Sequence, residues 1–318
     1  MKEMLQSLPN DSLEKEEAII CDYNQTSYSK FWTSPSKSLL DKKERRIIRN
    51  LIPPLSGWFV DLGCGYGRLL PTYMNSNRQI VLVDYALNLL EEGSQRYSQD
   101  GIHFIAADVY HLPFRDNVFD CGLSVRLFHH INAPQSFLNE VTRIFHKGAR
   151  LVLSYSNKRN MLRIFKHGAK AFSHDHEEYS EMLFGTHPGY FAELCRNAAF
   201  RIERTRGTGF LDQFFRVNSS FDHLLSRMRF LALPISIVED IASWTLGRMN
   251  LAPLHFASLC KESGAETSSV ELKRPQNLIE ILACPCCRSI NLSELEKDYT
   301  CLDCGKIYPR RGRIIDFR

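Results

Sequence analysis

The chain has 318 residues, of which 44% are hydrophobic and 24% charged, as is typical of a globular protein with a full apolar core. The formal net charge of +4 is too mild for a protein dedicated to nucleic-acid binding, although it leaves local basic patches open. The most apolar stretch, residues 230–238, is far shorter than the ~20 residues of a membrane-spanning helix, and residues 1–20 lack the apolar core of a secretory signal, so we expect a cytoplasmic protein.

The first half of the chain predicts an α/β fold. Residues 1–50 are polar and mostly helical in pattern, and from Trp58 onward short apolar runs alternate with helical segments. We expect strands at 58–63, 79–84, 102–108, 119–125 and 149–156, with helices between them that include 86–97 and 133–148. Strands that alternate with helices are typical of a mostly parallel sheet with both faces covered.

The second half continues this pattern and then changes character. We expect a helix at 187–199, strands at 200–206 and 254–262, and an apolar helical insertion at 211–252 between these strands. The insertion suits a lid over a hydrophobic ligand or a docking face for the tail of the chain, and a simple extension of the core is the alternative. The small polar residues 263–275 predict a linker between a large domain, 1–262, and a small one, 276–318.

A glycine-rich loop follows the first predicted strand. The strand ends at Asp61, glycines occupy positions 63, 65 and 67, and a helix is expected to begin near Arg68. Glycine lets the backbone turn sharply and approach a ligand closely. A tight turn that needs glycine only for packing is the alternative.

The next two predicted strands also end in acidic residues. Asp84 ends the second strand, where a carboxylate can bind ribose hydroxyls, and a solvated strand end is the alternative. Asp108 ends the third strand, where a carboxylate can accept from an adenine amino group while Val109 lies against the ring. A turn-capping role is the alternative for Asp108.

Together these segments resemble class I S-adenosylmethionine-dependent methyltransferases, specifically the methyltransferase type 11 branch that includes quinone-biosynthesis enzymes. The resemblance rests on "VDLGCGYGR", "VLVD", "AADVYHLPFRDNVFD" and residues 127–157, and it covers roughly residues 23–262. A dehydrogenase usually has G-x-G-x-x-G, whereas this loop has glycine at every second position after Asp61. The resemblance implies a seven-stranded, mostly parallel Rossmann-like sheet with the last strand antiparallel.

The resemblance also implies where the cofactor would lie. The glycine loop should border its methionine half, the acids after strands two and three should hold its ribose and adenine, and the end of strand four should lie beside its sulfonium. An N-terminal helical segment within 1–50 should close over it as a lid. The residues that would bind the cofactor are Asp61, Gly63, Gly65, Gly67, Asp84, Asp108, Val109, Ser124 and Tyr28.

Candidates for contact with the methyl acceptor come from loops at the carboxyl ends of the strands. Arg126, His129 and His130 follow strand four directly, and His187 precedes the helix that leads to strand six. Packing or helix capping is the alternative for one histidine of the pair His129 and His130. The basic run 157–170 would attract an anionic acceptor, either a phosphate-bearing molecule or RNA, and a solvated helix face is the alternative.

The tail contains two C-x-x-C pairs, Cys284 with Cys287 and Cys301 with Cys304. This spacing predicts a structural zinc site with four thiolate ligands and no open position, in which Cys286 is the spare thiol. The segment resembles the Trm112-like zinc-ribbon family, whose members serve as activating partners of methyltransferases. The resemblance implies a ribbon that packs on its own catalytic domain and stabilises it.

These observations lead to one expected function and two alternatives. We expect methyl transfer from S-adenosylmethionine to a small, partly apolar metabolite, because the core resembles that branch and the insertion offers an apolar lid. The first alternative is methylation of an RNA base, particularly in tRNA, with the ribbon as a fused activator. The second is a scaffold that binds the cofactor without catalysis, which the intact glycine loop and following acids disfavour.

Overall fold

The computed structural model describes residues 18–20, 32, 34–54, 57–74, 78–180, 182–210, 232–262, 274–295 and 298–318. Several sequence predictions fall on other residues. Tyr28, most of the predicted linker and residues 211–231 of the predicted insertion lie outside the described residues.

Seven strands form the central part of the main sheet, in the spatial order β3-β2-β1-β4-β5-β9-β8. The first five pair in parallel, whereas β9 pairs antiparallel with both of its neighbours. Each overlaps a strand predicted from the sequence, so the mixed α/β sheet is confirmed. Their bounds are β1 (Gly57–Leu62), β2 (Arg78–Asp84), β3 (Ile102–Ala106), β4 (Phe119–Ser124), β5 (Phe145–Ser156), β8 (Phe200–Thr208) and β9 (Leu254–Lys261).

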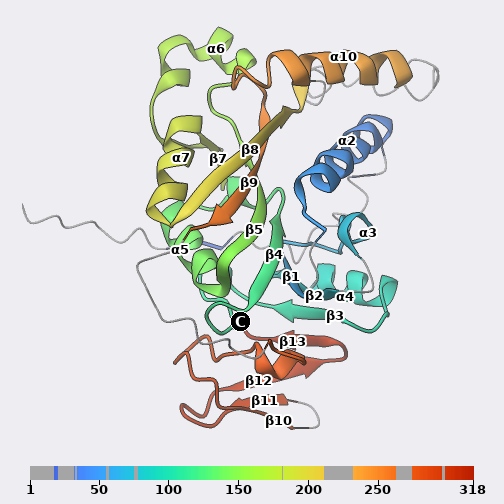
Figure 1. Ribbon diagram of the computed structural model, residues 1–318, viewed down its shortest axis with the longest axis vertical. Helices are drawn as coiled ribbons and strands as arrows, with labels where there is room; N and C mark the ends of the chain where they lie inside the picture. The colour runs from blue at the N-terminus through green and yellow to red at the C-terminus, as the bar shows by residue number, and fades with distance from the viewer. Residues whose placement is uncertain are drawn as a thin grey trace, which may run out of the picture.

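The sheet does not end with these strands, so the predicted number of seven is wrong. Four tail strands extend it to eleven: β13 (Ile314–Asp316), β12 (Ile307–Arg311), β11 (Asp298–Cys301) and β10 (Leu292–Glu294). β13 pairs in parallel with β3, so that Ile314 lies beside Phe104. Without the tail, β3 would expose an edge of unpaired backbone groups. Figure 1 shows the tail strands beyond β3, at the bottom of the view.

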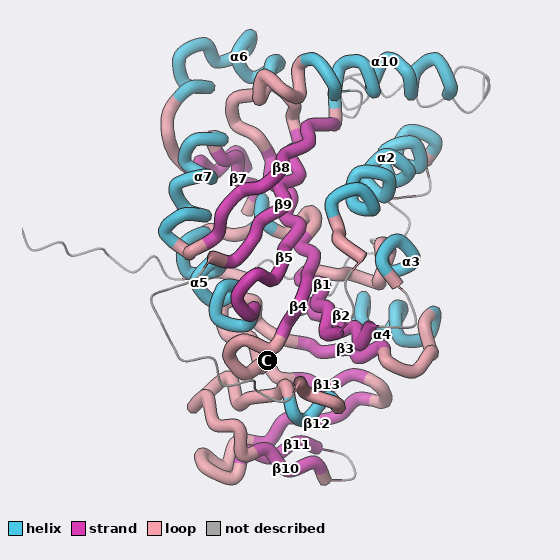
Figure 2. Tube along the Cα trace, in the orientation of Figure 1, coloured by secondary structure: helices cyan, strands magenta, loops and turns pink. Residues whose placement is uncertain are grey.

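Helices cover both faces of the sheet (Figures 1 and 2). Side chains alternate between the faces of each strand, and this divides the core into two large clusters. The cluster that contains Phe59 packs against α2 (Pro35–Leu51), α3 (Leu70–Tyr73) and α4 (Leu87–Arg96). The cluster that contains Val60 packs against α5 (Pro134–Ile144) and α7 (Pro188–Asn197), and it runs on into the tail through residues such as Leu282, Tyr308 and Phe317.

Two further helices and a hairpin lie around the end of the sheet opposite the tail. They are α6 (Met161–His167), a hairpin of β6 (His176–Ser180) and β7 (Leu183–Thr186), and α10 (Ala232–Thr245). The two strands of the hairpin pair antiparallel, with His176 beside Thr186. Figure 1 places α10 far from β10–β13, so docking of the insertion on the tail is wrong for its described part. No helix among the described residues is long and apolar enough to cross a membrane.

Candidate functional site

A large cavity opens at the carboxyl ends of β1, β2 and β4, where ligands bind in open α/β sheets. It encloses about 980 Å³, part of it open to solvent. Ile19 and Ile20 also line it, and the N–H of Ile19 donates to Asn132 Oδ1 at 2.9 Å. Part of the predicted N-terminal lid therefore reaches the cavity. The other lining residues are Asp61, Gly63, Cys64, Gly65, Tyr66, Arg68, Leu69, Asp84, Tyr85, Leu89, Val109, Tyr110, Val125, Arg126, Leu127, His130 and Ile131.

All three glycines of the loop have positive φ, and two of them, Gly63 and Gly65, line the cavity. Gly63 has φ 71°, and a Cβ there would lie 2.9 Å from Leu127 Cβ, so a side chain would collide with the opposite wall of the cavity. Gly65 has φ 55°, and its N–H donates to Asp84 Oδ2 at 2.7 Å. Gly67 also has positive φ, but it faces Tyr97 and does not line the cavity.

Asp84 and Asp61 are the two carboxylates of the cavity wall. Asp84 holds the loop in place through Oδ2, which accepts from the N–H of Gly65. Its Oδ1 accepts from the N–H of Ala86 at 2.9 Å, which fixes the carboxylate itself. Asp61 is buried, and the Tyr73 hydroxyl donates to it. Burial raises the pKa of Asp61 to about 7, although the Tyr73 hydrogen bond and the Arg68 charge act in the opposite direction. A cationic ligand beside Asp61 would favour its ionised form.

The loop after β3 presents apolar surface to the cavity. Val109 and Tyr110 line it, whereas the predicted adenine ligand Asp108 does not. The Asp108 carboxylate accepts from the N–H of Tyr110 at 2.8 Å and contacts His111 Nδ1 at 2.7 Å. Asp108 therefore has the geometry of a turn-capping residue, which is the alternative to adenine binding.

Of the three histidines predicted to contact the acceptor, only His130 lines the cavity. Its Nδ1 donates to the carbonyl of Met182 at 2.8 Å, and burial lowers its pKa, so Nε2 lacks a proton in the neutral ring. The His129 ring packs against it, with centroids 4.1 Å apart. His187 instead caps α7, where its Nδ1 accepts from the N–H of Gly189.

Sequence reasoning missed a charged cluster that anchors α2 to the cavity. Glu44 is fully buried and accepts from Arg126 Nε at 2.7 Å and from Arg68 at 2.8 Å. The Arg68 guanidinium in turn lies 3.6 Å from the centre of the Trp32 ring. Glu44 lies in a charged run that resembles a solvated helix face, so the sequence offers no local signal for this role. Ser124, predicted to border the cofactor, is fully buried beneath the cavity wall and does not line it.

The tail brings together the four predicted zinc ligands. The sulfur atoms of Cys284, Cys287, Cys301 and Cys304 all lie within 4.8 Å of one another, and two of the pairs are 3.6 and 3.5 Å apart. A tetrahedral site with Zn–S bonds of roughly 2.3 Å places its sulfurs roughly 3.8 Å apart, so the arrangement fits a zinc ion. Cys286 is exposed and outside this group.

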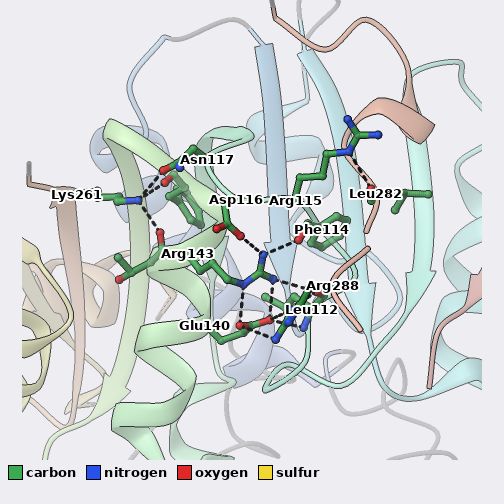
Figure 3. Close-up of polar contacts among 12 residues, drawn as sticks. Leu112, Phe114, Arg115, Asp116, Asn117, Glu140, Arg143, Lys261, Leu282 and Arg288 are labelled. Atoms are coloured by element: carbon green, nitrogen blue, oxygen red, sulfur yellow. Dashed lines mark hydrogen bonds and ion pairs between the residues drawn. The ribbon is translucent and has the colours of Figure 1, made fainter. Parts of the chain in front are cut away.

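The tail also contacts the loop that carries Val109 and Tyr110. Figure 3 shows Arg288 of the tail and Arg143 of α5 converging on Glu140. Arg288 donates to both carboxylate oxygens of Glu140, at 2.9 and 3.1 Å, and to the carbonyl of Leu112. The N–H of Leu112 donates back to Glu140 at 2.7 Å. One buried carboxylate therefore connects the tail, α5 and the loop after β3.

Further contacts tie the tail to the cavity wall. The N–H of Phe317 donates to the carbonyl of Ala106 at 2.8 Å. The Arg318 guanidinium donates to the carbonyl of Tyr85 at 3.0 Å and lies 5.2 Å from the centre of its ring. Tyr85 lines the cavity, so the tail supports two of its walls.

Comparison with known proteins identifies the central part of the chain. Residues 60–153 match the family described as "Methyltransferase domain", so the chain carries such a domain. Demethylmenaquinone methyltransferase of Renibacterium salmoninarum is 30% identical over 114 residues, which cover 36% of this chain and 47% of that protein. The 2-phytyl-1,4-naphtoquinone methyltransferase of a Nostoc species is 35% identical over 102 residues, or 30% of this chain and 44% of that protein.

The alignments are partial, and the chain spans less than half the length of the first curated relatives it matches. Among solved structures, the [4+2]-cyclase SpnF aligns with 70% of this chain and 81% of its own, with 17% identity and a TM-score of 0.50. This likeness indicates a shared fold.

Proposed function

We propose that the protein transfers a methyl group from S-adenosylmethionine to a small, partly apolar metabolite. The observation that carries this proposal is the cavity after β1, in which a glycine-rich loop, two carboxylates and an apolar wall occur together inside a methyltransferase domain. The partial alignments with quinone methyltransferases support the choice of a metabolite acceptor.

The residues of the cavity fit the chemical groups of this cofactor. Asp84 would hold the ribose diol, since it lines the cavity at the carboxyl end of β2 and its position is fixed by the N–H groups of Gly65 and Ala86. Asp61 would pair with the ammonium of the methionine part, whose charge would favour the ionised carboxylate that burial disfavours. Val109 and Tyr110 would pack against the adenine.

When bound, the cofactor supplies a methyl group activated by a sulfonium, so the protein has mainly to position the acceptor and exclude water. His130 would accept a proton from an acceptor that must lose one, because its Nδ1–H is held by Met182 and its Nε2 is the basic atom. The Arg126–Glu44 pair fixes the wall beside it. Ile19 and Ile20 would shield the site from solvent.

The four clustered thiolates would hold a structural zinc ion, and the tail would stabilise the catalytic part. A segment of about forty residues cannot bury enough apolar surface to fold alone, so the metal and the shared core would both contribute. The hydrogen bonds to Leu112, Ala106 and Tyr85 support this role, since each reaches a segment that forms or adjoins the cavity wall.

Calorimetry with S-adenosylhomocysteine tests the cofactor assignment. The protein should bind one equivalent, and Asp84→Ala should reduce the affinity at least tenfold, because the loop loses its brace and the ribose its acceptor. Asp100→Ala, which removes an exposed carboxylate in the turn before β3, is the matched control and should bind normally. Absence of binding to the unmodified protein would refute the proposal.

A further inference from the structure

A second cavity adjoins the first at the carboxyl ends of the strands. It contains about 890 Å³ of space, part of it open to solvent, and shares Arg126 with the cofactor cavity. Its walls come from the segment after β5, from α6, from β6 and from the start of β9. The lining residues are Arg126, Ser156, Asn157, Asn160, Leu162, Arg163, Lys166, His167, Tyr179, Gly209, Pro253 and Leu254.

The described lining of this second cavity is basic and contains no carboxylate. Arg126 is largely neutralised by Glu44, whose carboxylate lies 2.6 Å from its guanidinium. The remaining positive charge comes from α6, which contributes Lys166 and also Arg163, whose guanidinium reaches the carboxylate of Glu177 at 3.3 Å. Such a wall favours an anion over a neutral or cationic group.

Arg163 provides the most specific signal. Its guanidinium lies 3.7 Å from the centre of the Tyr179 ring, which fixes the plane of the group. Its NH2 reaches Glu177 only at 3.3 Å, and Lys158 is closer to the same oxygen, at 2.7 Å. Its Nε is buried and has no hydrogen-bond partner among the described residues. Buried charged donors normally have an acceptor, so this atom indicates an absent one.

The two amide side chains of the cavity lining are already hydrogen-bonded. Asn157 Nδ2 donates to the carbonyls of Asn250 and Ala252, each at 2.8 Å, and Asn160 Nδ2 donates to the carbonyl of Asn157 at 2.7 Å. These amides maintain the shape of the cavity. Recognition of a charged ligand is left to the cationic side chains.

We propose that this cavity is the methyl-acceptor site and that the acceptor carries an anionic group, a phosphate or a carboxylate, held by Arg163 and Lys166. The inference rests on the proposed methyltransferase function and narrows its substrate class. Because both cavities are lined by Arg126, an acceptor held in the second one would extend toward the cofactor bound in the first. A cavity with two basic side chains from one short helix suits a small acceptor, whereas RNA needs an extended basic surface.

Inorganic phosphate, titrated at constant ionic strength into the zinc-loaded full chain saturated with S-adenosylhomocysteine, tests the anion site. Phosphate should bind the unmodified protein, and Arg163→Gln and Lys166→Gln should each weaken it at least fivefold. Lys166 is exposed, so its substitution should leave the fold intact even if that of Arg163 does not. Lys170→Gln, an exposed cation in the same segment but outside the lining, is the matched control. Equal phosphate affinity in all four proteins, or none in any, overturns the anion site.

A product assay tests the acceptor class. Methyl-labelled cofactor and a small-molecule extract should yield a labelled product that an anion-exchange resin retains, with less product from Lys166→Gln than from Lys170→Gln. Loss of retention after phosphatase identifies a phosphate ester, and retention after phosphatase identifies a carboxylate. A neutral or cationic product, or a nuclease-sensitive one, overturns the inference. If S-adenosylhomocysteine does not bind, the proposed methyltransferase function fails. If it binds and phosphate does not, only the anion site fails.

Discussion

Replacement of Glu140 by alanine is the sharpest test of the connection between the tail and the catalytic part. Glu140 is 8% exposed and accepts hydrogen bonds from Arg143, Arg288 and the N–H of Leu112. Removing one partner of a buried ion pair costs about 3–5 kcal/mol. We expect the lower end, about 3 kcal/mol, because Arg143 keeps Asp116 as a partner and Arg288 is 40% exposed.

Urea unfolding followed by tryptophan fluorescence measures this loss, since the Trp58 Nε1–H donates to the carbonyl of Pro275, the residue directly before the tail. Arg288→Ala alone should cost about 1 kcal/mol, as its side chain is partly solvated. The double variant should be less destabilised than the sum of the two single ones by about 1 kcal/mol. Glu294→Ala, which removes an exposed pair with Arg310, is the control and should change stability by under about 0.5 kcal/mol.

The same site predicts a pH dependence. Burial alone would raise the pKa of Glu140, but the hydrogen bonds from Arg143 and Arg288 outweigh it and lower the pKa below its ordinary value of 4.5. Its contribution to stability is therefore present above pH 4.5 and is lost as the pH falls through the lowered pKa. The stability gap between the unmodified protein and Glu140→Gln should narrow over that range. Additive single variants, or a Glu140→Ala loss below about 1 kcal/mol, would refute the linked cluster.

Three further predictions follow from the cavity and the tail. Affinity for S-adenosylhomocysteine should fall up to about tenfold per pH unit below the Asp61 pKa of about 7, because the ammonium needs the ionised carboxylate. Asp61→Asn should remove this pH dependence, and an unchanged pH dependence in the variant would contradict pairing of Asp61 with the ammonium. Gly63→Ala should cost about 1–3 kcal/mol in unfolding free energy, because its φ is positive and its Cβ would meet Leu127; a neutral effect would contradict the loop geometry. Metal analysis should find one zinc per chain, and Cys304→Ser should lose it together with thermal stability; full stability without metal would contradict a structural site.

The sequence predicts well the features that depend on residues close together in the chain. Hydrophobic runs located the seven central strands, and the glycines at 63 and 65 located the cavity, because strand pattern and left-handed backbone depend on neighbouring residues. The C-x-x-C spacing likewise located the thiolate cluster. These signals do not require knowledge of distant contacts.

The features that escaped prediction depend on residues far apart in the chain. Glu44 and Arg126 meet only after α2 folds across the sheet, and Arg288 meets Glu140 only after the tail docks. His129 and His130 are adjacent and chemically identical, yet only the backbone geometry after β4 decides which one reaches the cavity. The parallel pairing of β13 with β3 is of the same kind.

That pairing has a consequence for synthesis on the ribosome. Strand β3 is translated early, whereas the residues that cover its edge, Ile314–Asp316, emerge only after the whole catalytic part. During this interval the nascent sheet carries an open, apolar margin, and closing so long a loop is intrinsically slow. Binding of a metal ion by the tail would stabilise the tail late in folding, when β13 pairs with β3. Chains without the metal would keep the edge of β3 unpaired and remain prone to aggregate.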